Sequence, residues 1–497
     1  MYRVEIKGSK LYLAQQVKEG EQLIASEQNR AMYQLMEEAG KSVFNSIVAG
    51  YSGCKHLLVL CGSGNNGGDG YVTARLALLH GYKVTLWQTG SEESLKGDAA
   101  KARDNWLAVN GQIAKPETIL ADDIDLIVDS LLGTGLSGAV REEYQSIIQL
   151  INQSPVPVVS IDVPSGLSAD TGAVLGCAVQ ADKTITFIAS KQGLFTGCAK
   201  DYCGEIVFAG LGIADDFSQK IEASSLLLSA QSLGGSLTGR KPTSHKGHFG
   251  RVLCMGGDRG MFGAIRLASE ACARTGSGLT RVVTQPENVS AIVSARPELM
   301  VFDWRGNSNE INDHLHWADV LLIGPGLGTT SWGRSLMGYS ASIEKRMVVD
   351  ADGLNLLARV PDFNSRRIIT PHPGEAARLL NCTIDQIESD RFSSVMRLQR
   401  KYGGVAVLKG AGTLIYDGKQ LYVCNAGNPG MASGGMGDVL SGVIAGLLAQ
   451  NLTLTQAACF GVWLHSTAAD RCVQEHGEIG MLASDLYPYL RQLLATC

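Results

Sequence analysis

Short apolar runs alternate with helix-like segments along most of the chain. The runs are rich in Val, Ile and Leu, as in buried strands of parallel sheets. Between them, apolar residues recur with helical spacing, as in Val72, Leu76 and Leu79, and a further helix is expected at Met32–Val48. We expect strands at His56–Cys61, Lys83–Trp87, Asp125–Val128, Val156–Ile161, Thr184–Ile188, Glu205–Phe208, Arg251–Met255, Val320–Ile323, Met347–Val349, Arg367–Thr370 and Gly404–Lys409.

This alternation loses its regularity between residues 212 and 250, where Ser, Gly and the polar stretch Arg240–Lys246 interrupt it. A chain of 497 residues is also too long for one ordinary hydrophobic core. Strands that alternate with helices indicate parallel sheets with crossover helices. We therefore expect two α/β domains, at residues 1–218 and 219–497, with no fixed-period repeat between them.

Composition narrows the classes of function. Acidic residues exceed basic ones, 48 against 43, so the chain has no broad cationic surface for a nucleic acid. The longest apolar helix-like segment, Val439–Ala449, is about half the ~20 residues that a membrane span needs. The N-terminus lacks the apolar region of a signal peptide, so we expect a cytoplasmic protein. The 12 cysteines include no C-x-x-C pair and are expected to be reduced thiols.

The first glycine-rich segment, Gly62–Gly70, follows an expected strand and precedes a helix, which is the context of a dinucleotide-binding turn. Asp69 is unusual there because its carboxylate would repel a pyrophosphate; it is either a ligand or the N-cap of the helix. Asp129 and Asp162 end two further strands. Each could be a simple turn residue, but ligands bind beyond the carboxyl ends of such strands, so we favour one site. Its oxygen-rich composition suits a hard cation better than zinc.

Three segments, Gly62–Gly70, Val128–Leu136 and Ile161–Gly166, resemble the NAD(P)H-hydrate epimerase domain. The resemblance implies a Rossmann-like, doubly wound fold, with Asp162 as the catalytic acid/base at nicotinamide C6. It also implies a potassium ion bound by Asn66, Asp129 and Ser165. The hydrated dinucleotide would contact Asp162 and two loops, namely Asn65, Asn66, Gly67, Gly68 and Asp69, and Gly133, Thr134, Gly135, Leu136, Ser137, Gly138 and Ala139.

A second glycine-rich segment, Asn428–Asp438, precedes the expected apolar helix Val439–Leu448. Backbone N–H groups at such a helix start can hold a developing phosphate charge, and Asp438 could take a hydroxyl proton, which together suggest phosphoryl transfer. Asp438 could instead be only an N-cap. Lys409–Thr413 could hold a nucleotide or be a bare turn, and Asp350–Asn355 could bind magnesium or cap a helix. His372 lies between two prolines, where a structural role is the usual one.

Together with Gly256–Asp258 and Ile323–Gly328, these segments resemble the ADP/ATP-dependent NAD(P)H-hydrate dehydratases, which are similar to ribokinase-like kinases. The resemblance implies Asp438 as the catalytic base, Mg²⁺ with ADP as the co-substrate of a bacterial form, and a homo-oligomer. The hydrated nucleotide would contact Ala264, Gly326, His372 and Asp438. The adenine nucleotide would contact Lys409, Gly410, Ala411, Gly412, Thr413 and Gly437.

The resulting hypothesis is a two-step repair of damaged cofactor, with NADHX, NADPHX and ADP as the small-molecule substrates. One domain would interconvert the R and S hydrates, and the other would dehydrate the S form. A small-alcohol kinase fused to a nucleotide-binding module is the alternative enzyme; it would not require the Asn65–Asp69 pattern or Asp129 and Asp162. A nucleotide-sensing regulator is the non-enzymatic alternative, and it would keep its function after Asp438→Asn.

Overall fold

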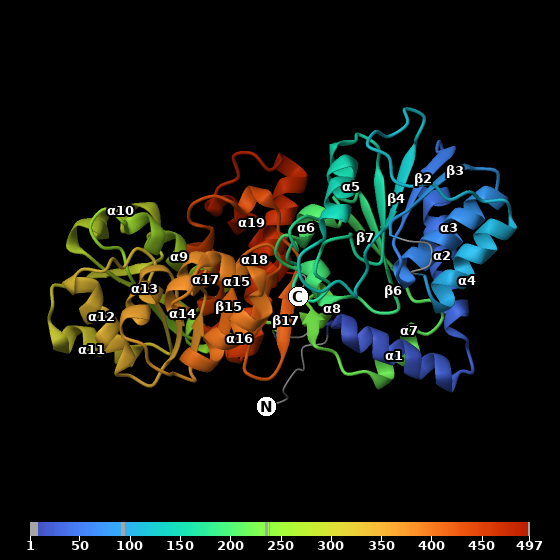
Figure 1. The fold of residues 1–497 in the computed structure, drawn as a ribbon. Helices are drawn as coiled ribbons and strands as arrows, with labels where there is room; N and C mark the ends of the chain where they lie inside the picture. Colours follow the sequence, from blue (N-terminus) through green and yellow to red (C-terminus); the bar gives the residue numbers. More distant parts are fainter. Residues whose placement is uncertain (1–7, 91–94, 234–236, 238, 496–497) are drawn as a thin grey trace. The chain divides into compact units, whose positions relative to one another are not determined.

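The structure is a computed structural model that describes residues 8–90, 95–233, 237 and 239–495. The chain forms two compact units, one spanning Lys10–Ser225 and the other, here called the C-terminal unit, comprising Gly8 and Ser9 together with the described residues from Leu226 onward. The functional division at residues 218 and 219 stays a prediction. Both units contain a parallel sheet flanked by helices (Figure 1), which confirms the expected α/β class.

The N-terminal unit contains a six-stranded parallel sheet in the order β3-β2-β4-β5-β6-β7. The elements up to this sheet's last helix are β1 (Ser9–Leu11), α1 (Ala14–Glu27), α2 (Met32–Gly50), β2 (His56–Cys61), α3 (Asn65–Leu79), β3 (Lys83–Gln88), α4 (Gly97–Ala108), β4 (Leu126–Ser130), α5 (Glu142–Gln153), β5 (Val158–Ile161), β6 (Lys183–Phe187), the 3-10 turn η2 (Gln192–Phe195), α6 (Ala199–Tyr202), β7 (Glu205–Ala209) and α7 (Ala214–Lys220).

Strand β2 shows why this sheet is covered on both faces. Leu57, Val59 and Cys61 lie in one core with residues of α2, α3 and α4. Leu58 and Leu60 alternate with them and lie in a second core with residues of α5. Because successive side chains of a strand point to opposite faces, an uninterrupted apolar strand must be buried on both. Figure 1 shows α3 and α5 on opposite sides of the sheet.

The C-terminal unit has its strands in the order β8-β17-β16-β15-β14-β13-β12-β9-β10-β11, with β16 antiparallel to both neighbours. Its elements are β8 (Ser225–Leu227), α8 (Ala230–Leu233), η3 (Lys246–Phe249), β9 (Arg251–Met255), α9 (Phe262–Thr275), β10 (Leu279–Thr284), η4 (Pro286–Asn288), α10 (Val289–Ala295), β11 (Met300–Asp303), α11 (Ser308–Trp317), β12 (Val320–Ile323), α12 (Ser331–Ala341), β13 (Arg346–Val349), α13 (Ala351–Arg359), β14 (Arg367–Ile369), α14 (Pro373–Leu380), α15 (Ile384–Ser389), α16 (Arg391–Tyr402), β15 (Val405–Leu408), β16 (Thr413–Tyr416), β17 (Leu421–Cys424), η5 (Pro429–Met431), α17 (Met436–Ala449), α18 (Leu454–His476), η6 (Ala483–Asp485) and α19 (Leu486–Leu494).

Each sheet has a point at which the strand order reverses. In the N-terminal unit β3 lies on one side of β2 and β4 on the other; in the C-terminal unit β10 and β12 flank β9 in the same way. Crossover connections leave opposite faces of the sheet on the two sides of such a point, so the loops beyond the carboxyl ends of the strands separate there and admit a ligand. The glycine-rich segments Gly62–Gly64 and Gly256–Asp258 lie at these two points.

The structure corrects the start of two helices. Helix α3 begins at Asn65 with Gly64 as its N-cap, so Asn65–Gly70 is helical rather than a turn, and Asp69 is not the N-cap. Helix α17 begins at Met436 with Gly435 as its N-cap at φ 91°, so the N-cap interpretation of Asp438 is also wrong. Asp438 therefore lies in the first turn of α17 and Asp69 in the second turn of α3, and neither is the capping residue of its helix.

Candidate active sites

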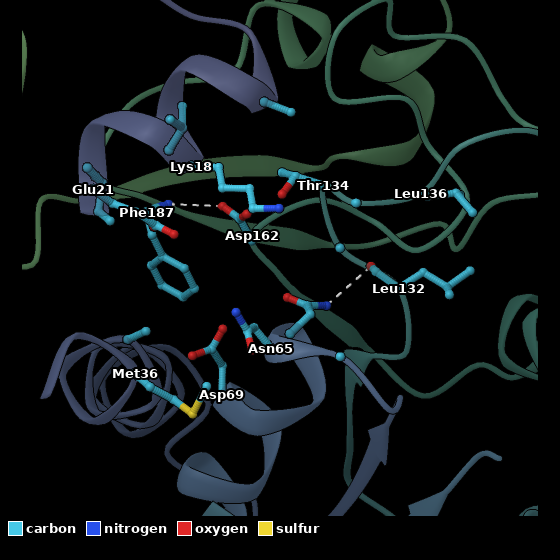
Figure 2. A pocket seen from close by; sticks show the side chains of 18 of the residues that line it. Lys18, Glu21, Met36, Asn65, Asp69, Leu132, Thr134, Leu136, Asp162 and Phe187 are labelled. Atoms are coloured by element: carbon cyan, nitrogen blue, oxygen red, sulfur yellow. Dashed lines mark hydrogen bonds between the residues drawn. The ribbon is translucent and has the colours of Figure 1, made fainter. Parts of the chain in front are cut away.

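A cavity of about 710 Å³ lies at the carboxyl ends of β2, β4 and β5 (Figure 2). Its walls come from the loops after these strands and from α1 and α2. The predicted substrate residues among its lining are Asn65, Asn66, Asp69, Gly133, Thr134, Gly135, Leu136, Ser137 and Asp162. The structure thus brings together both predicted loops and the predicted catalytic acid.

Four other predicted substrate residues do not line this cavity. Gly67 lies against β2, where a Cβ atom would come within 1.9 Å of the Gly62 carbonyl oxygen. Gly68 faces Met36, with 2.6 Å between its Cβ position and the Met36 Cε. These glycines let α3 approach its neighbours closely, which is one established role of such fingerprints. Gly138 and Ala139 are exposed farther along the loop.

Asp162 follows β5 in a left-handed conformation, with φ 67°, that aspartate tolerates better than most residues. Its Oδ1 accepts hydrogen bonds from the Phe187 backbone N–H at 3.2 Å and from the ammonium of Lys191. Lys191 is 1% exposed and also donates to the Phe187 carbonyl at 3.0 Å. A buried ammonium therefore holds the carboxylate, which is 15% exposed, at the cavity wall.

Two further carboxyls line the same cavity, and one of them was not predicted. Burial, reinforced by the negative charge of Asp162, raises the pKa of Glu21 on α1 to about 7. Burial likewise raises the pKa of Asp69 well above its usual value, with Asp162 and Glu21 adding to the effect. The sequence contains one weak indication that Glu21 has a functional role. This charged residue lies four positions after Val17, on the apolar face of α1.

The three residues predicted to bind potassium meet around the carbonyl of Leu132. Ser165 Oγ lies 3.1 Å and Asn66 Nδ2 3.2 Å from that oxygen. Asp129 is fully buried and accepts hydrogen bonds from Ser160, from Leu131 N–H and from both the N–H and the hydroxyl of Ser165. Burial raises the Asp129 pKa, while these donors oppose that shift. A cation here would require the Asn66 amide to turn its oxygen inward.

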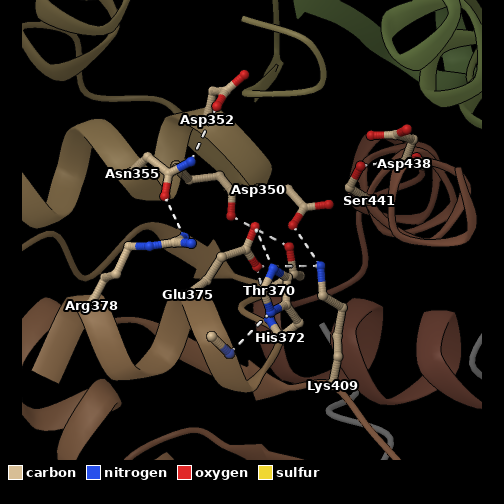
Figure 3. Close-up of polar contacts among 12 residues, drawn as sticks. Asp350, Asp352, Asn355, Thr370, His372, Glu375, Arg378, Lys409, Asp438 and Ser441 are labelled. Atoms are coloured by element: carbon tan, nitrogen blue, oxygen red, sulfur yellow. Dashed lines mark hydrogen bonds and ion pairs between the residues drawn. The ribbon is translucent and has the colours of Figure 1, made fainter. Parts of the chain in front are cut away.

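In the C-terminal unit, charged side chains gather at the ends of β13, β14 and β15 (Figure 3). Lys409 Nζ lies 2.8 Å from Asp350 Oδ1 and 3.7 Å from Glu375 Oε2. Burial would lower the pKa of Lys409, but Asp350, Glu375 and Asp438 together outweigh it and raise the pKa. The lysine is therefore a permanent cation.

Asp438 and Gly437 bring the start of α17 to this cluster. A Cβ atom on Gly437 would lie 3.1 Å from Lys409 Nζ and 3.7 Å from Asp350 Oδ2. Burial, together with repulsion from Asp350, raises the pKa of Asp438 to about 7. Its carboxylate receives no hydrogen bond from another described residue. This arrangement places free helix N–H groups beside a cation and a carboxyl that can exchange a proton near neutral pH.

His372 has a structural role in the described chain. Its Nδ1 accepts a hydrogen bond from Gly374 N–H at 3.0 Å, and Glu375 Oε2 accepts one from the His372 N–H at 2.8 Å. This capping box starts α14 and holds Glu375 beside Lys409. The imidazole stays 51% exposed although its Nε2 lies 3.6 Å from Glu375 Oε1, so the ring keeps a surface that a ligand can reach. Burial and the charge of Lys409 lower its pKa.

The predicted nucleotide loop, Lys409–Thr413, connects β15 to β16 as an antiparallel hairpin. Arg391, 1% exposed, donates to the Leu408 and Lys409 carbonyls at 3.3 and 3.1 Å and packs beneath Gly410, which has φ 141°. Glu388 pairs with the other guanidinium nitrogen at 2.7 Å. The buried Arg391 side chain thus holds the loop in place through hydrogen bonds to its backbone. The sequence pattern alone does not distinguish Arg391 from a surface arginine.

Ala264 and Gly326, both predicted to contact the hydrated nucleotide, are neighbours at the reversal point of the second sheet. A Cβ atom on Gly326 would lie 3.3 Å from Ala264 Cβ and 2.5 Å from the Met261 carbonyl. Asp258 links the same loops, because its N–H donates to Gly326 O at 2.6 Å and its Oδ2 accepts from Thr330 Oγ1 at 2.9 Å.

No group of three or more His, Cys, Asp and Glu side chains among the described residues could hold a metal ion. No helix in that part of the chain is long and apolar enough to cross a membrane. The cysteines among these residues are free thiols.

Comparison with known proteins assigns a protein family to each unit. Residues 252–492 match a family model described as NAD(P)H-hydrate dehydratase, and residues 32–193 match one described as YjeF-related protein N-terminus. A ribokinase-like superfamily protein of Enterococcus faecalis, 31% identical, aligns with a TM-score of 0.51 over 54% of this chain and 95% of its own. The C-terminal unit therefore has the ribokinase-like fold that was expected, and the N-terminal unit has a Rossmann-like sheet.

Relatives of known name match nearly the full length. The bifunctional NAD(P)H-hydrate repair enzyme Nnr of Vibrio cholerae is 46% identical over 97% of this chain and 98% of its own. The enzyme of the same name in Escherichia coli is 47% identical over 97% of this chain and 94% of its own. The chain belongs to the family of bifunctional NAD(P)H-hydrate repair enzymes, as the sequence motifs predicted.

Proposed function

We propose that the protein repairs hydrated nicotinamide dinucleotides at two separate sites. The N-terminal site interconverts the R and S forms of NADHX and NADPHX. The C-terminal site transfers a phosphoryl group from ADP to the C6 hydroxyl of the S form and releases phosphate. The observation that best supports this proposal is that each unit places a candidate acid/base beside the carboxyl ends of its parallel strands.

At the N-terminal site, Asp162 is the proposed catalytic residue. Epimerisation at C6 requires the hydroxyl to leave one face of the ring and return to the other, so a proton must be delivered to it and taken back. Lys191 holds Asp162 in place for this exchange. Glu21, whose pKa burial raises to about 7, can hold a proton near neutral pH in the same cavity, and burial also raises the pKa of Asp69.

Potassium is proposed beside this site, at Asn66, Asp129 and Ser165. The donor set fits in part, because the Leu132 carbonyl, the Ser165 hydroxyl and a rotated Asn66 amide supply oxygens of the kind that hard cations prefer. The bound ion would contribute positive charge near the dinucleotide. Replacing KCl by choline chloride should slow epimerisation, and adding potassium back should restore it.

At the C-terminal site, hydroxide is a poor leaving group and phosphate a good one, so a kinase-like site suffices for dehydration. Asp438 takes the hydroxyl proton, and the Gly435–Gly437 N–H groups stabilise the transferring phosphoryl group. Loss of phosphate from C6 and of a proton from C5 then restores the ring double bond. Lys409 contributes a fixed positive charge, and the Lys409–Thr413 loop holds the adenine nucleotide.

Magnesium is proposed to accompany ADP. The absence of a three-residue metal cluster among the described residues fits this, because Mg²⁺ is usually held by substrate phosphates with one or two carboxylates. Asp350, which pairs with Lys409 at 2.8 Å, and Asp438, whose charge also acts on Lys409, are the carboxylates proposed to assist. The bound ion would supply charge neutralisation at the phosphates. We also propose a cytoplasmic homo-oligomer, which sedimentation of the purified chain would test.

The direct experiment follows the return of reduced-nicotinamide absorbance from purified S hydrate and from an R/S mixture, with and without ADP. We expect ADP-dependent recovery of the whole mixture, faster than a control without enzyme that measures spontaneous epimerisation. Recovery of the S fraction alone would contradict the proposed N-terminal activity. No recovery with ADP or ATP in folded protein would favour a small-alcohol kinase.

A further inference from the structure

A second cavity, of about 310 Å³, lies in the C-terminal unit and shares no lining residue with the proposed dehydratase site. Helices α9 and α19, the segment after α10 and the turn η6 supply its walls. Its lining is Arg266, Glu270, Arg274, Arg296, Ser484, Tyr487, Pro488 and Arg491. We call it the arginine cavity. Its volume lies at the lower end of the ~300–1,000 Å³ typical of small-molecule sites.

The charge of this cavity is unbalanced. Glu270, 1% exposed, pairs with Arg274 at 2.9 Å, with Arg296 at 2.5 Å and with Arg266 at 3.5 Å. The fourth arginine, Arg491, forms no ion pair with an acid in the described part of the chain. One carboxylate therefore faces four guanidinium groups, and three positive charges remain uncompensated within the lining.

Hydrogen bonding within the arginine cavity is incomplete as well. The Nε atoms of Arg266 and Arg296 are buried and find no hydrogen-bond partner among the described residues. Buried donors of this kind carry a desolvation cost that an added acceptor would remove. The guanidinium groups are also held in place, because Glu270 joins three of them and Arg274 lies over the Tyr487 ring, 5.5 Å from its centroid. Such preorganisation lowers the entropic cost of binding.

We propose that the arginine cavity binds the phosphate or diphosphate group of a small molecule. Planar guanidinium forks match the oxygens of phosphate and bind it through paired, charge-assisted hydrogen bonds. Excess positive charge excludes cationic ligands and draws anions in. Glu270 stays beneath the arginines, where it orients their side chains.

The walls of the arginine cavity contact the helix start that forms part of the proposed dehydratase site. The Tyr487 hydroxyl donates to the Leu267 carbonyl of α9 at 3.0 Å. A Cβ atom on Gly435 would lie 2.6 Å from Leu267 Cδ1 and 3.2 Å from Ala483 Cβ. Gly435 is the N-cap of α17, whose first N–H groups form the proposed phosphoryl-binding turn. The walls of the arginine cavity therefore pack directly against the turn proposed to bind the transferring phosphoryl group.

Pyrophosphate is the probe for this proposal, titrated calorimetrically into the full chain and into Arg491→Gln and Arg296→Gln variants. Arg400→Gln is the matched control, because Arg400 is an exposed arginine on α16 outside the arginine cavity. We expect the wild type and the control to have a pyrophosphate site that each cavity variant weakens at least about tenfold, the usual cost of a lost charge-assisted hydrogen bond. Glu270→Gln should tighten the same site.

Equal pyrophosphate binding by all five proteins would overturn the proposal, because only sites elsewhere would then bind the anion. A change of oligomeric state in Arg491→Gln, with pyrophosphate binding unaltered, would overturn it too and would make this face an interface between copies of the chain. Inorganic phosphate, titrated in parallel, shows whether one phosphate group suffices. Both repair activities of Arg491→Gln are assayed without added anion, so a failure of the proposed function is seen separately.

Discussion

Both sites place a candidate acid near the carboxyl ends of parallel strands, but they surround it differently. Asp162 is held by the buried ammonium of Lys191. Asp438 has no such tether, because Lys409 pairs with Asp350 and Glu375 instead. The tether fixes the position of Asp162, whereas the untethered and buried carboxyl of Asp438, with a pKa of about 7, exchanges its proton near neutral pH.

This difference matches the chemistry proposed for each site. Epimerisation moves a hydroxyl from one face of a ring to the other, and a fixed group must serve both directions. Phosphoryl transfer needs one proton removed while negative charge collects on the phosphate, so Lys409 is kept for charge and Asp438 for the proton.

Removing each acid should separate the two activities. Asp162→Asn should slow epimerisation by about 10²–10⁴-fold and leave dehydration of pure S hydrate unchanged, and Asp438→Asn should do the reverse. Steady-state rates on separated epimers give the measurement. Loss of both activities in both folded variants would show that the two-site assignment is wrong.

Removing the tether should cost stability as well as activity. Lys191→Met leaves the Asp162 carboxylate without its cation, and the unfolding free energy should fall by about 3 kcal/mol. Urea unfolding, followed by a signal from the N-terminal unit, measures this change. Lys83→Met is the matched control, because its ion pair with Asp123 is exposed and should contribute at most about 0.5 kcal/mol. Equal small effects would mean that Lys191 does not hold Asp162.

Asp438 should lower the free energy of unfolding at pH values where its carboxyl is charged. A carboxyl whose pKa is raised on folding binds its proton more tightly in the folded state, so its contribution to stability falls as pH rises from about 4 to 7. Asp438→Asn removes that loss and should raise the unfolding free energy by about 2 kcal/mol at pH 8. The gain should vanish near pH 4. A variant that is less stable than wild type at pH 8 would contradict this pKa direction.

The dehydratase should lose activity in acid for the same reason. Asp438 must be ionised to take a proton, so kcat/KM should fall about tenfold per pH unit below about pH 7. Assays on S hydrate between pH 5.5 and 8.5, at constant ionic strength, would show the profile. A flat profile across pH 7 would remove Asp438 as the base.

The smallest effect concerns the support of the nucleotide loop. Arg391→Gln removes two donors to the Leu408 and Lys409 carbonyls and loosens Gly410. We expect KM for ADP to rise about fivefold, with kcat and epimerisation little changed, which corresponds to about 1 kcal/mol of lost hydrogen bonding. Arg400→Gln on the same helix serves as the control. A fall in kcat with unchanged KM would place Arg391 in the chemistry instead.

The strands and the motif residues could be predicted because each depends on local pattern. His56–Cys61, Arg251–Met255 and Val320–Ile323 were predicted with the boundaries that the structure shows, since short apolar runs that end at turn residues are typical of buried strands. The site motifs follow strand ends, and parallel topology brings strand ends together. The residues of both sites could therefore be named before their geometry was known.

What could not be predicted depends on contacts far apart in sequence. Asn65–Gly70 looked like a turn because glycine disfavours helices, but close packing of α3 against β2 outweighs that cost. The β16–β17 hairpin, with its Asp417–Gly418 turn, was not predicted, although that dipeptide is a hairpin signal. Glu21 and Arg391 carry no motif, and their roles arise only from what the fold places beside them.

The central claim is that two independent sites act in sequence, and mixing the two defective variants tests it most directly. Asp162→Asn and Asp438→Asn are each given an R/S mixture of NADHX with ADP, Mg²⁺ and K⁺, alone and then together. We expect Asp162→Asn alone to restore the S hydrate, together with the small amount of R hydrate that epimerises spontaneously. Asp438→Asn alone should restore no NADH. The two variants together should restore the whole R/S mixture. Failure of the folded variants to complement each other would contradict the account.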